Sequence, residues 1–102
     1  MKSRLELHTQ LKQICDKVYY QPGDNTTLIY PCITYNIIDE LSLMANDISH
    51  TIFLKYGVTY ISDDPEKLDE IIVKLSKIPY SSFMQSTIID GLYHIYFEIT
   101  NQ

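Results

Sequence analysis

The sequence has few basic residues, and their distribution argues against contact with nucleic acid. The 102 residues include eight Lys and Arg against 13 Asp and Glu, which gives a formal net charge of −5. No basic residue lies between Val18 and Leu54 or after Lys77, although acidic residues occur in both stretches. Proteins that contact phosphates gather Lys and Arg on one face. We therefore expect no direct binding to nucleic acid, whereas an acidic surface that repels DNA is compatible with this pattern.

Other shortages exclude further classes of protein. The two cysteines, Cys15 and Cys32, are too few for a disulfide framework, so we expect a reduced, intracellular setting and two small buried apolar side chains. Three glycines leave no Gly-rich loop that could cradle phosphates. No apolar run approaches the ~18 residues of a membrane span, and the N-terminus has no apolar segment of the kind found in signal peptides.

Candidate catalytic side chains are scarce. The three histidines lie on three separate predicted elements and show no His-x-x-His or Glu-x-x-His spacing typical of metal sites. Asp63 and Asp64 resemble a carboxylate pair, but helix capping accounts for Asp64. Cys32 has no basic residue nearby in sequence that would lower its pKa. We therefore expect no enzymatic activity, no metal and no cofactor, with a small hydrolase dependent on Cys32 or His94 as an alternative.

Hydrophobic periodicity and capping signals predict two helices. The first covers about residues 3–17, where Ser3 and Glu6 have the spacing of a capping box. The second begins with Asp64 as its cap and Pro65 in its first turn, and it ends before the next proline. Each helix carries one apolar stripe, which must be buried.

Four strands are expected, at about residues 28–37, 50–62, 82–89 and 92–100. Residues 39–46 show no clean period, and we predict the wide end of a hairpin there, with room for a helical turn. Asp90-Gly91 is a two-residue hairpin turn. It pairs Ile88 with Tyr93, Ser86 with Ile95 and Met84 with Phe97 on the face toward the helices. The reverse face then holds Phe83, Gln85, Thr87, His94, Tyr96 and Glu98.

The element order is therefore α-β-β-α-β-β in a single domain of residues 1–102. This order predicts an α+β fold with a four-stranded antiparallel sheet and two helices packed on one of its faces. The other face, which mixes aromatic and polar side chains, suits partial burial against another chain.

A proline inside the first predicted strand indicates where a partner would bind. Proline cannot donate to a sheet ladder, so such a strand belongs at an edge or a bulge, and an apolar edge invites pairing. We predict an interface that includes Tyr30, Pro31, Ile33, Tyr35, His94 and Tyr96. The nine tyrosines fit an interface, but they also fit a β-rich domain that uses tyrosine as a strand former.

Several short motifs, in this order and spacing, resemble a family of tailed-phage structural proteins. They are Gln21-Pro22, Tyr30-Pro31-Cys32-Ile33-Thr34-Tyr35, Met44-Ala45-Asn46, Tyr56-Gly57-Val58-Thr59-Tyr60-Ile61 with Asp64-Pro65, and Asp90-Gly91-Leu92-Tyr93-His94. The resemblance covers roughly residues 5–98. Gly23, Thr34, Asn46-Asp47 and Gly91-Leu92-Tyr93 depart from the family pattern without changing the predicted elements.

This family is that of the tail terminators, or tail-completion proteins, of long-tailed phages. The resemblance implies a virion protein of the tail and neck, assembled in the host cytoplasm, whose subunits close into a hexameric ring. Such a ring caps the tail tube, stops its polymerisation and joins the tail to the head. The implied partners are further copies, the major tail tube protein and a head-completion or neck protein. DNA would pass through the lumen without specific binding, and no membrane is involved.

Acidic residues near the wide hairpin, Asp39, Glu40 and Asp47, are then expected to line the lumen or to face the tube. Two other functions stay open at this point. One is a head-closure or adaptor ring protein of the connector. The other is a free-standing ligand-binding domain of ferredoxin-like type.

Overall fold

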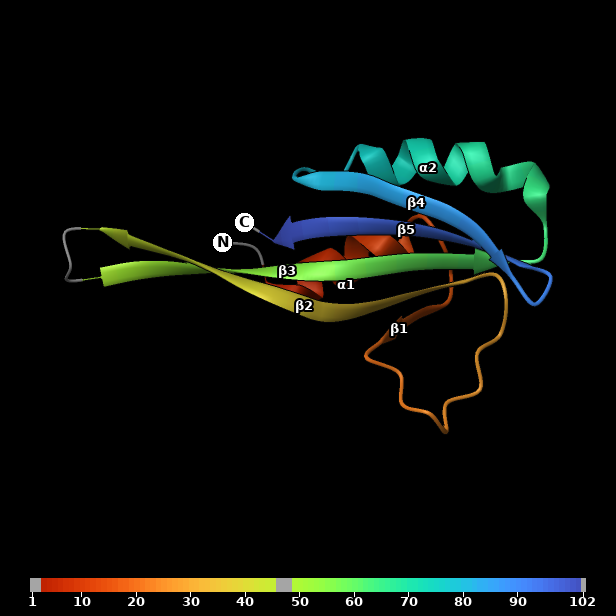
Figure 1. Cartoon of the computed structure of the whole chain (residues 1–102), viewed down its shortest axis with the longest axis horizontal. Coiled ribbons are helices and arrows are strands. Elements are labelled where there is room, and N and C mark those ends of the chain that lie inside the picture. Colours follow the sequence, from red (N-terminus) through yellow and green to blue (C-terminus); the bar gives the residue numbers. More distant parts are fainter. Residues whose placement is uncertain (1–2, 46–48, 102) are drawn as a thin grey trace.

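A computed structural model describes residues 3–45 and 49–101, with side chains described outside residues 41–52. Within these ranges the chain forms one five-stranded sheet, two α-helices and a short 3₁₀ helix (Figure 1). The elements in chain order are α1 (Arg4–Lys12), β1 (Val18–Tyr20), β2 (Cys32–Ala45), β3 (Ser49–Ser62), η1 (Pro65–Lys67), α2 (Leu68–Ser76), β4 (Ser81–Ile89) and β5 (Leu92–Asn101). The predicted α+β class is confirmed.

The sheet has the strand order β1-β2-β3-β5-β4 and is mixed. β1 runs parallel to β2, with Val18 opposite Ile33, while the remaining neighbours are antiparallel. The prediction of four antiparallel strands was therefore wrong, because the sheet has a fifth strand that runs parallel to its neighbour. The first helix ends at Lys12 instead of residue 17, and Val18–Tyr20, which consists of a β-branched and two aromatic residues, joins the sheet edge instead.

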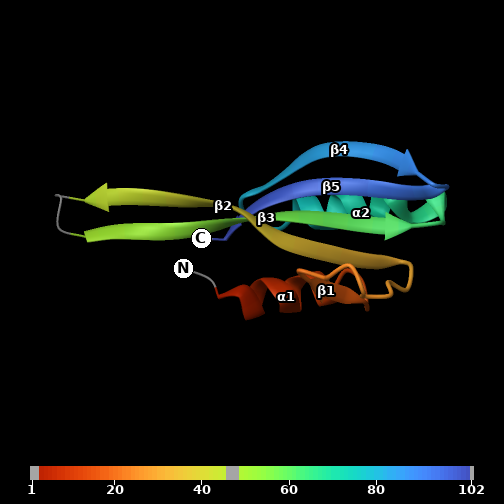
Figure 2. The same ribbon diagram turned by 60° about the horizontal axis from the view of Figure 1, so that its bottom comes forward.

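Both helices bury their apolar stripes against the same face of the sheet. Leu7 and Leu11 of α1 and Ile71 and Leu75 of α2 share one core with the sheet. The sheet contributes Ile33, Tyr35, Tyr56, Val58, Tyr60, Ile95, Phe97 and Ile99 to this core. In Figure 2, α2 lies behind β3 and β5. The opposite face, which we call the helix-free face, is covered by neither helix.

Local signals at the helix ends confirm their predicted starts. The backbone amide of Glu6 donates to Ser3 Oγ over 3.2 Å, and the amide of Glu66 donates to Asp64 Oδ1 over 2.9 Å. Pro65 opens a 3₁₀ turn that leads directly into α2. Such caps satisfy amides that have no acceptor inside the helix.

The hairpin of β4 and β5 turns where predicted, but its register changes part of the way along. Asp90 and Gly91 both have positive φ, 52° and 79°, as a two-residue type I′ turn requires. A bulge between Phe83 and Gln85 then adds one residue to β4. It places Phe83, and not Met84, opposite Phe97, so Phe83 moves to the helix side, where the two rings lie 5.5 Å apart between centroids. The predicted placement of these two residues was wrong because a bulge reverses the side-chain alternation.

Pro31 precedes the strand that was predicted to contain it. β2 begins at Cys32, residues 28–31 belong to a loop, and the Tyr30–Pro31 peptide is cis. The parallel ladder starts one residue later, where the amide of Ile33 donates to the carbonyl oxygen of Lys17 over 2.8 Å. Because proline has no amide hydrogen, it cannot donate to such a ladder.

The hairpin of β2 and β3 extends far beyond the rest of the sheet (Figures 1 and 2). β1 accompanies β2 only to Tyr35, and β5 accompanies β3 only to Leu54, yet β2 and β3 pair as far as Ala45 and Ser49. We call Leu41–Ala45 with Ser49–Phe53 the arm. The molecule accordingly measures 50 × 30 × 22 Å. The prediction of a wide hairpin end at residues 39–46 was wrong for the described residues, because β2 continues as a regular strand to Ala45.

Candidate interaction surfaces

Two of the predicted interface residues lie inside the core. Ile33 and Tyr35 have no exposed surface, because both project from β2 toward the helices. They therefore cannot meet a partner, and their place in the predicted interface was wrong. Since Pro31 lies outside the strand, the alternation that begins at Cys32 directs the odd-numbered residues of this segment inward.

The polar tip of Tyr35 is satisfied within the subunit. Its hydroxyl lies 2.7 Å from His8 Nδ1 and 3.2 Å from the Arg4 guanidinium, which donates to it. Arg4 also stacks over the Tyr20 ring at 4.3 Å from its centroid. Burial raises the pKa of Tyr35, and burial together with the nearby Arg4 and Lys12 lowers the pKa of His8. This cluster fixes α1 to the sheet edge.

The loop that connects β1 to β2 carries the other half of the predicted segment. Ile29 and Tyr30 are 55% and 40% exposed, and Pro31 is also exposed. The loop projects from the sheet beside β1 (Figure 1). Tyr30 and Pro31 are therefore available to a partner, although they lie in a loop and not on a strand.

His94 and Tyr96 lie half-buried on the helix-free face of β5. Tyr96 extends across Gly57, where a Cβ atom would come within 2.6 Å of its hydroxyl oxygen. Beside it, Lys55 Nζ and Glu98 Oε1 form an ion pair at 3.2 Å. His94 Nδ1 lies 3.0 Å from the carbonyl oxygen of Leu92, so its ring is oriented by its own strand. This is a well-packed sheet face with a polar surface.

The structure describes two of the three acidic residues that were predicted to face the lumen or the tube. Asp39 and Glu40 are exposed on β2, just after a bulge between Ile37 and Asp39. Asp39 Oδ1 accepts a hydrogen bond of 2.8 Å from the amide of Glu40. Asp47 lies outside the described residues.

The free edge of β4 is a surface that periodicity alone did not indicate. Seven of the nine residues from Ser81 to Ile89 are exposed, including Met84, Ile88 and Ile89 at 49%, 64% and 53%. None of the nine is charged. Natural edge strands are commonly protected by lysine or proline, and β4 has neither. The run of uncharged residues was the available sequence signal.

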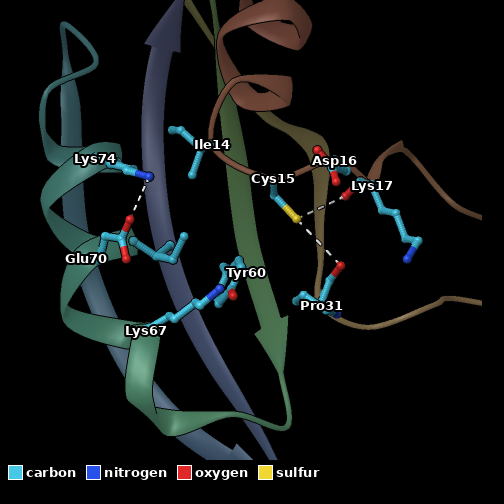
Figure 3. Close-up of a pocket in the computed structure, with 10 residues that line it drawn as sticks. Ile14, Cys15, Asp16, Lys17, Pro31, Tyr60, Lys67, Glu70 and Lys74 are labelled. Carbon is cyan, nitrogen blue, oxygen red and sulfur yellow. Dashed lines mark hydrogen bonds and ion pairs between the residues drawn. The ribbon is translucent and has the colours of Figure 1, made fainter.

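A cavity of about 270 Å³ opens between α2 and residues 14–17, the segment that follows α1 (Figure 3). Its lining includes Cys15, Tyr60, Lys67 and Lys74. Lys74 forms an ion pair with Glu70 at 2.8 Å. Cys15 Sγ is directed to the carbonyl oxygens of Lys17 and Pro31, at 3.7 and 3.5 Å. The lining of the cavity thus mixes charged and apolar side chains and includes no histidine.

Three further properties concern the Cys32 thiol, metal-binding side chains and membrane-spanning helices. Burial raises the pKa of Cys32 to about 11, which leaves its thiol protonated and a poor nucleophile at neutral pH. Among the described residues, no three His, Cys, Asp or Glu side chains are grouped closely enough to hold a metal ion. No helix in the described ranges is long and apolar enough to cross a membrane.

Comparisons with known proteins leave the family unassigned. The sequence matches no protein-family model, and no curated protein matches it significantly.

Proposed function

We propose that this protein is a structural ring subunit of a phage tail, a tail terminator that caps the tail tube and joins it to the neck. The observation that carries the proposal is a sheet with edges on opposite sides that no other described strand covers. β4 lies free at one side, and the arm extends past β1 at the other. A contact between two different surfaces of one chain repeats head to tail, and it forms a ring when the rotation closes.

The charge distribution supports the passage of DNA through such a ring. Asp39 and Glu40 stand exposed at the base of the arm, within a stretch of the chain that lacks Lys and Arg. Consecutive strand residues point to opposite faces, so at least one of the two carboxylates would face the lumen whichever face is turned inward, and it would repel phosphates within a Debye length of about 8–10 Å. DNA would then slide through the ring without adhering to it.

The resemblance of the sequence motifs to those of tail terminators supports a specific role for the ring. A terminator must bind further copies laterally, the tail tube protein on one side and a neck protein on the other. An elongated subunit with an arm, a loop bearing Tyr30 and Pro31, and a free sheet face offers surfaces in several directions. A head-closure or adaptor ring would need similar surfaces, so its position in the virion neck distinguishes the two roles.

The test is the mass of the purified chain, followed by its effect on tail tubes. Native mass spectrometry should show six copies, and electron microscopy should show rings. Adding these rings to polymerising tail tube protein should shorten the tubes and place a ring at one end. A monomer at micromolar concentration that leaves tube length unchanged would contradict the proposal.

One observation favours a second candidate, a ligand-binding domain. The cavity between α2 and residues 14–17 is close to the lower end of the range for small-molecule sites. A panel of small molecules that raised the melting temperature of wild type, but not of a Tyr60→Trp variant with a filled cavity, would support it.

A further inference from the structure

The arm is a two-stranded ribbon without a covering layer among the described residues. From Leu41 to Ala45, β2 is paired with β3 alone, and from Ser49 to Phe53, β3 is paired with β2 alone. Two strands by themselves are marginally stable in water, and a third strand or a packed helix is needed to hold them. The arm therefore requires a partner to be stable in the form observed.

The free edge of β4 presents backbone groups suited to that task. In a two-residue hairpin, Ile89 and Leu92 next to the turn form a hydrogen-bonded pair, and such pairs alternate with non-bonded ones along the ladder. The backbone N–H and C=O groups of Ser86 and Ile88 are therefore directed away from β5. No described strand pairs with that side of β4. The bulge at Met84 limits the regular free edge to Gln85–Ile89.

The two edges match in chemistry. β4 has no charged residue, and neither have the strands of the arm, Leu41–Ala45 and Ser49–Phe53. Pairing them would bury no charge, which is the main cost of bringing two strand edges together. This match between two parts of the same chain indicates that the partner is a second copy.

The two edges also match in direction. Within one sheet, β4 is antiparallel to β5, β5 to β3 and β3 to β2, so β4 runs antiparallel to β2. A neighbouring copy that is displaced across the sheet and keeps its strand direction therefore offers its β2 antiparallel to β4. Because β1 occupies the outer edge of β2 up to Tyr35, and the amide of Ile37 donates to Gln21 Oε1, the neighbour can pair with β2 only beyond these residues, where the strand continues into the arm. The resulting stagger is the kind that a closed sheet of tilted strands requires.

We propose that the edge of β4 at Gln85–Ile89 pairs antiparallel with the β2 strand of the arm, Leu41–Ala45, of the next copy. The arm thereby gains its third strand, and β4 is no longer a free edge. The inference rests on the proposed ring and specifies the contact that builds it. The alternative occupants of the β4 edge are a second β4 related by a two-fold axis and a strand of another protein.

Cross-linking of two variants, each with one cysteine added to the native two, distinguishes these occupants. Ser86→Cys places a thiol on β4 and Ser42→Cys places one on the arm, and a short bifunctional maleimide is added to each variant alone and to a 1:1 mixture. The native Cys15 and Cys32 are 8% and 0% exposed, so wild type is the control and should not cross-link. We expect cross-linked dimers only in the mixture, because each subunit carries one added thiol and can be joined to one other subunit. Dimers of Ser86→Cys alone would establish a two-fold β4 contact and overturn the proposal.

A matched pair of charge variants gives a second readout. Ser86→Lys introduces a charge at the β4 edge, and Ser76→Lys introduces the same charge on the exposed end of α2. Ser86→Lys should raise the concentration for half-assembly at least tenfold, whereas Ser76→Lys should leave it within twofold of wild type. Both should keep the wild-type circular dichroism spectrum.

The outcomes separate this inference from the proposed function. If the chain forms rings that show no mixed cross-link and tolerate Ser86→Lys, the ring stands and the β4–arm contact is wrong. If wild type forms no assembly, both are wrong.

Discussion

Packing on the helix-free face requires a residue without a side chain at position 57, which is Gly57. Gly57 lies on β3, opposite Glu98 of β5, and the phenol of Tyr96 passes directly over it. A Cβ atom at this position would lie 2.6 Å from the Tyr96 hydroxyl oxygen and 3.1 Å from Ile38 Cγ2. Glycine therefore allows an aromatic ring to cover the middle of the sheet.

We predict that Gly57→Ala lowers the free energy of unfolding by about 1–3 kcal/mol, because the new methyl group overpacks this contact. Denaturant unfolding measures the loss. In a Tyr96→Phe background, which lacks the nearest atom, the loss should be smaller by at least about 0.5 kcal/mol. Gly23→Ala is the control, since no atom lies within 4 Å of its Cβ position and the change should stay within about 0.5 kcal/mol. Equal losses at the two glycines would contradict the prediction.

A second residue-scale prediction concerns His8, whose pKa is lowered from its ordinary value of 6.5, first by burial and then by Arg4 and Lys12. The unfolded chain thus binds a proton at a pH where folded His8 does not. Stability from this group is complete above pH 6.5 and is lost as the pH falls below that value toward the lowered pKa. Unfolding free energies measured from about pH 8 to about pH 5 should fall less steeply for His8→Gln than for wild type. Identical slopes would show that His8 titrates normally.

At the scale of elements, caps and bulges decide where the helices and strands begin and how they are aligned. The bulge at Met84 turns Phe83 toward the core, and the bulge after Ile37 lies where the arm leaves the sheet. Bulges commonly bend a strand and increase its twist. These two single-residue insertions therefore shape both edges that we propose to meet in the ring.

The caps supply a matched test at this scale. Asp64→Ala should destabilise the protein by about 1 kcal/mol, because Asp64 Oδ1 accepts from the amide of Glu66 at the start of the second helix. Asp63→Ala removes the same charge from an exposed neighbour and should change stability by less than about 0.5 kcal/mol. Thermal or denaturant unfolding compares the pair. A larger loss at Asp63 would mean that charge, and not capping, matters here.

At the scale of the whole molecule, charge separates the sheet from the helices. Seven of the eight basic residues belong to the helices or the segments that flank them, and Lys55 of β3 is paired with Glu98. Neither the free edge of β4 nor the arm has a Lys or an Arg. The surfaces assigned to the ring are therefore neutral or acidic.

We accordingly predict no measurable binding of double-stranded DNA, even at about 50 mM salt, where phosphate contacts are strongest. Fluorescence anisotropy of a labelled duplex is the measurement. An Asp39→Lys/Glu40→Lys variant, which reverses two exposed charges, should bind measurably and lose that affinity as salt rises. Salt-dependent binding by wild type would contradict an acidic lumen.

Features that depend on neighbours in the chain were predictable. The caps at Ser3 and Asp64, the turn at Asp90-Gly91 and the apolar stripes of both helices follow from residues a few positions apart, and the structure confirms them. The candidate interface was predictable only in part. Tyr30 and Pro31 are exposed as it requires, but Ile33 and Tyr35 are buried. The side-chain alternation of this segment depends on the residue at which the strand starts.

The sequence by itself determined the α+β class, the two hairpins and the sign of the surface charge, because these depend on local patterning and composition. Only the tertiary structure decided that Val18–Tyr20 joins the sheet as a parallel strand, that bulges shift both hairpins and that β2 and β3 extend into an arm. Each of these results from pairing between segments that are distant in the chain, and period-two patterning does not specify the partner or the register of a strand.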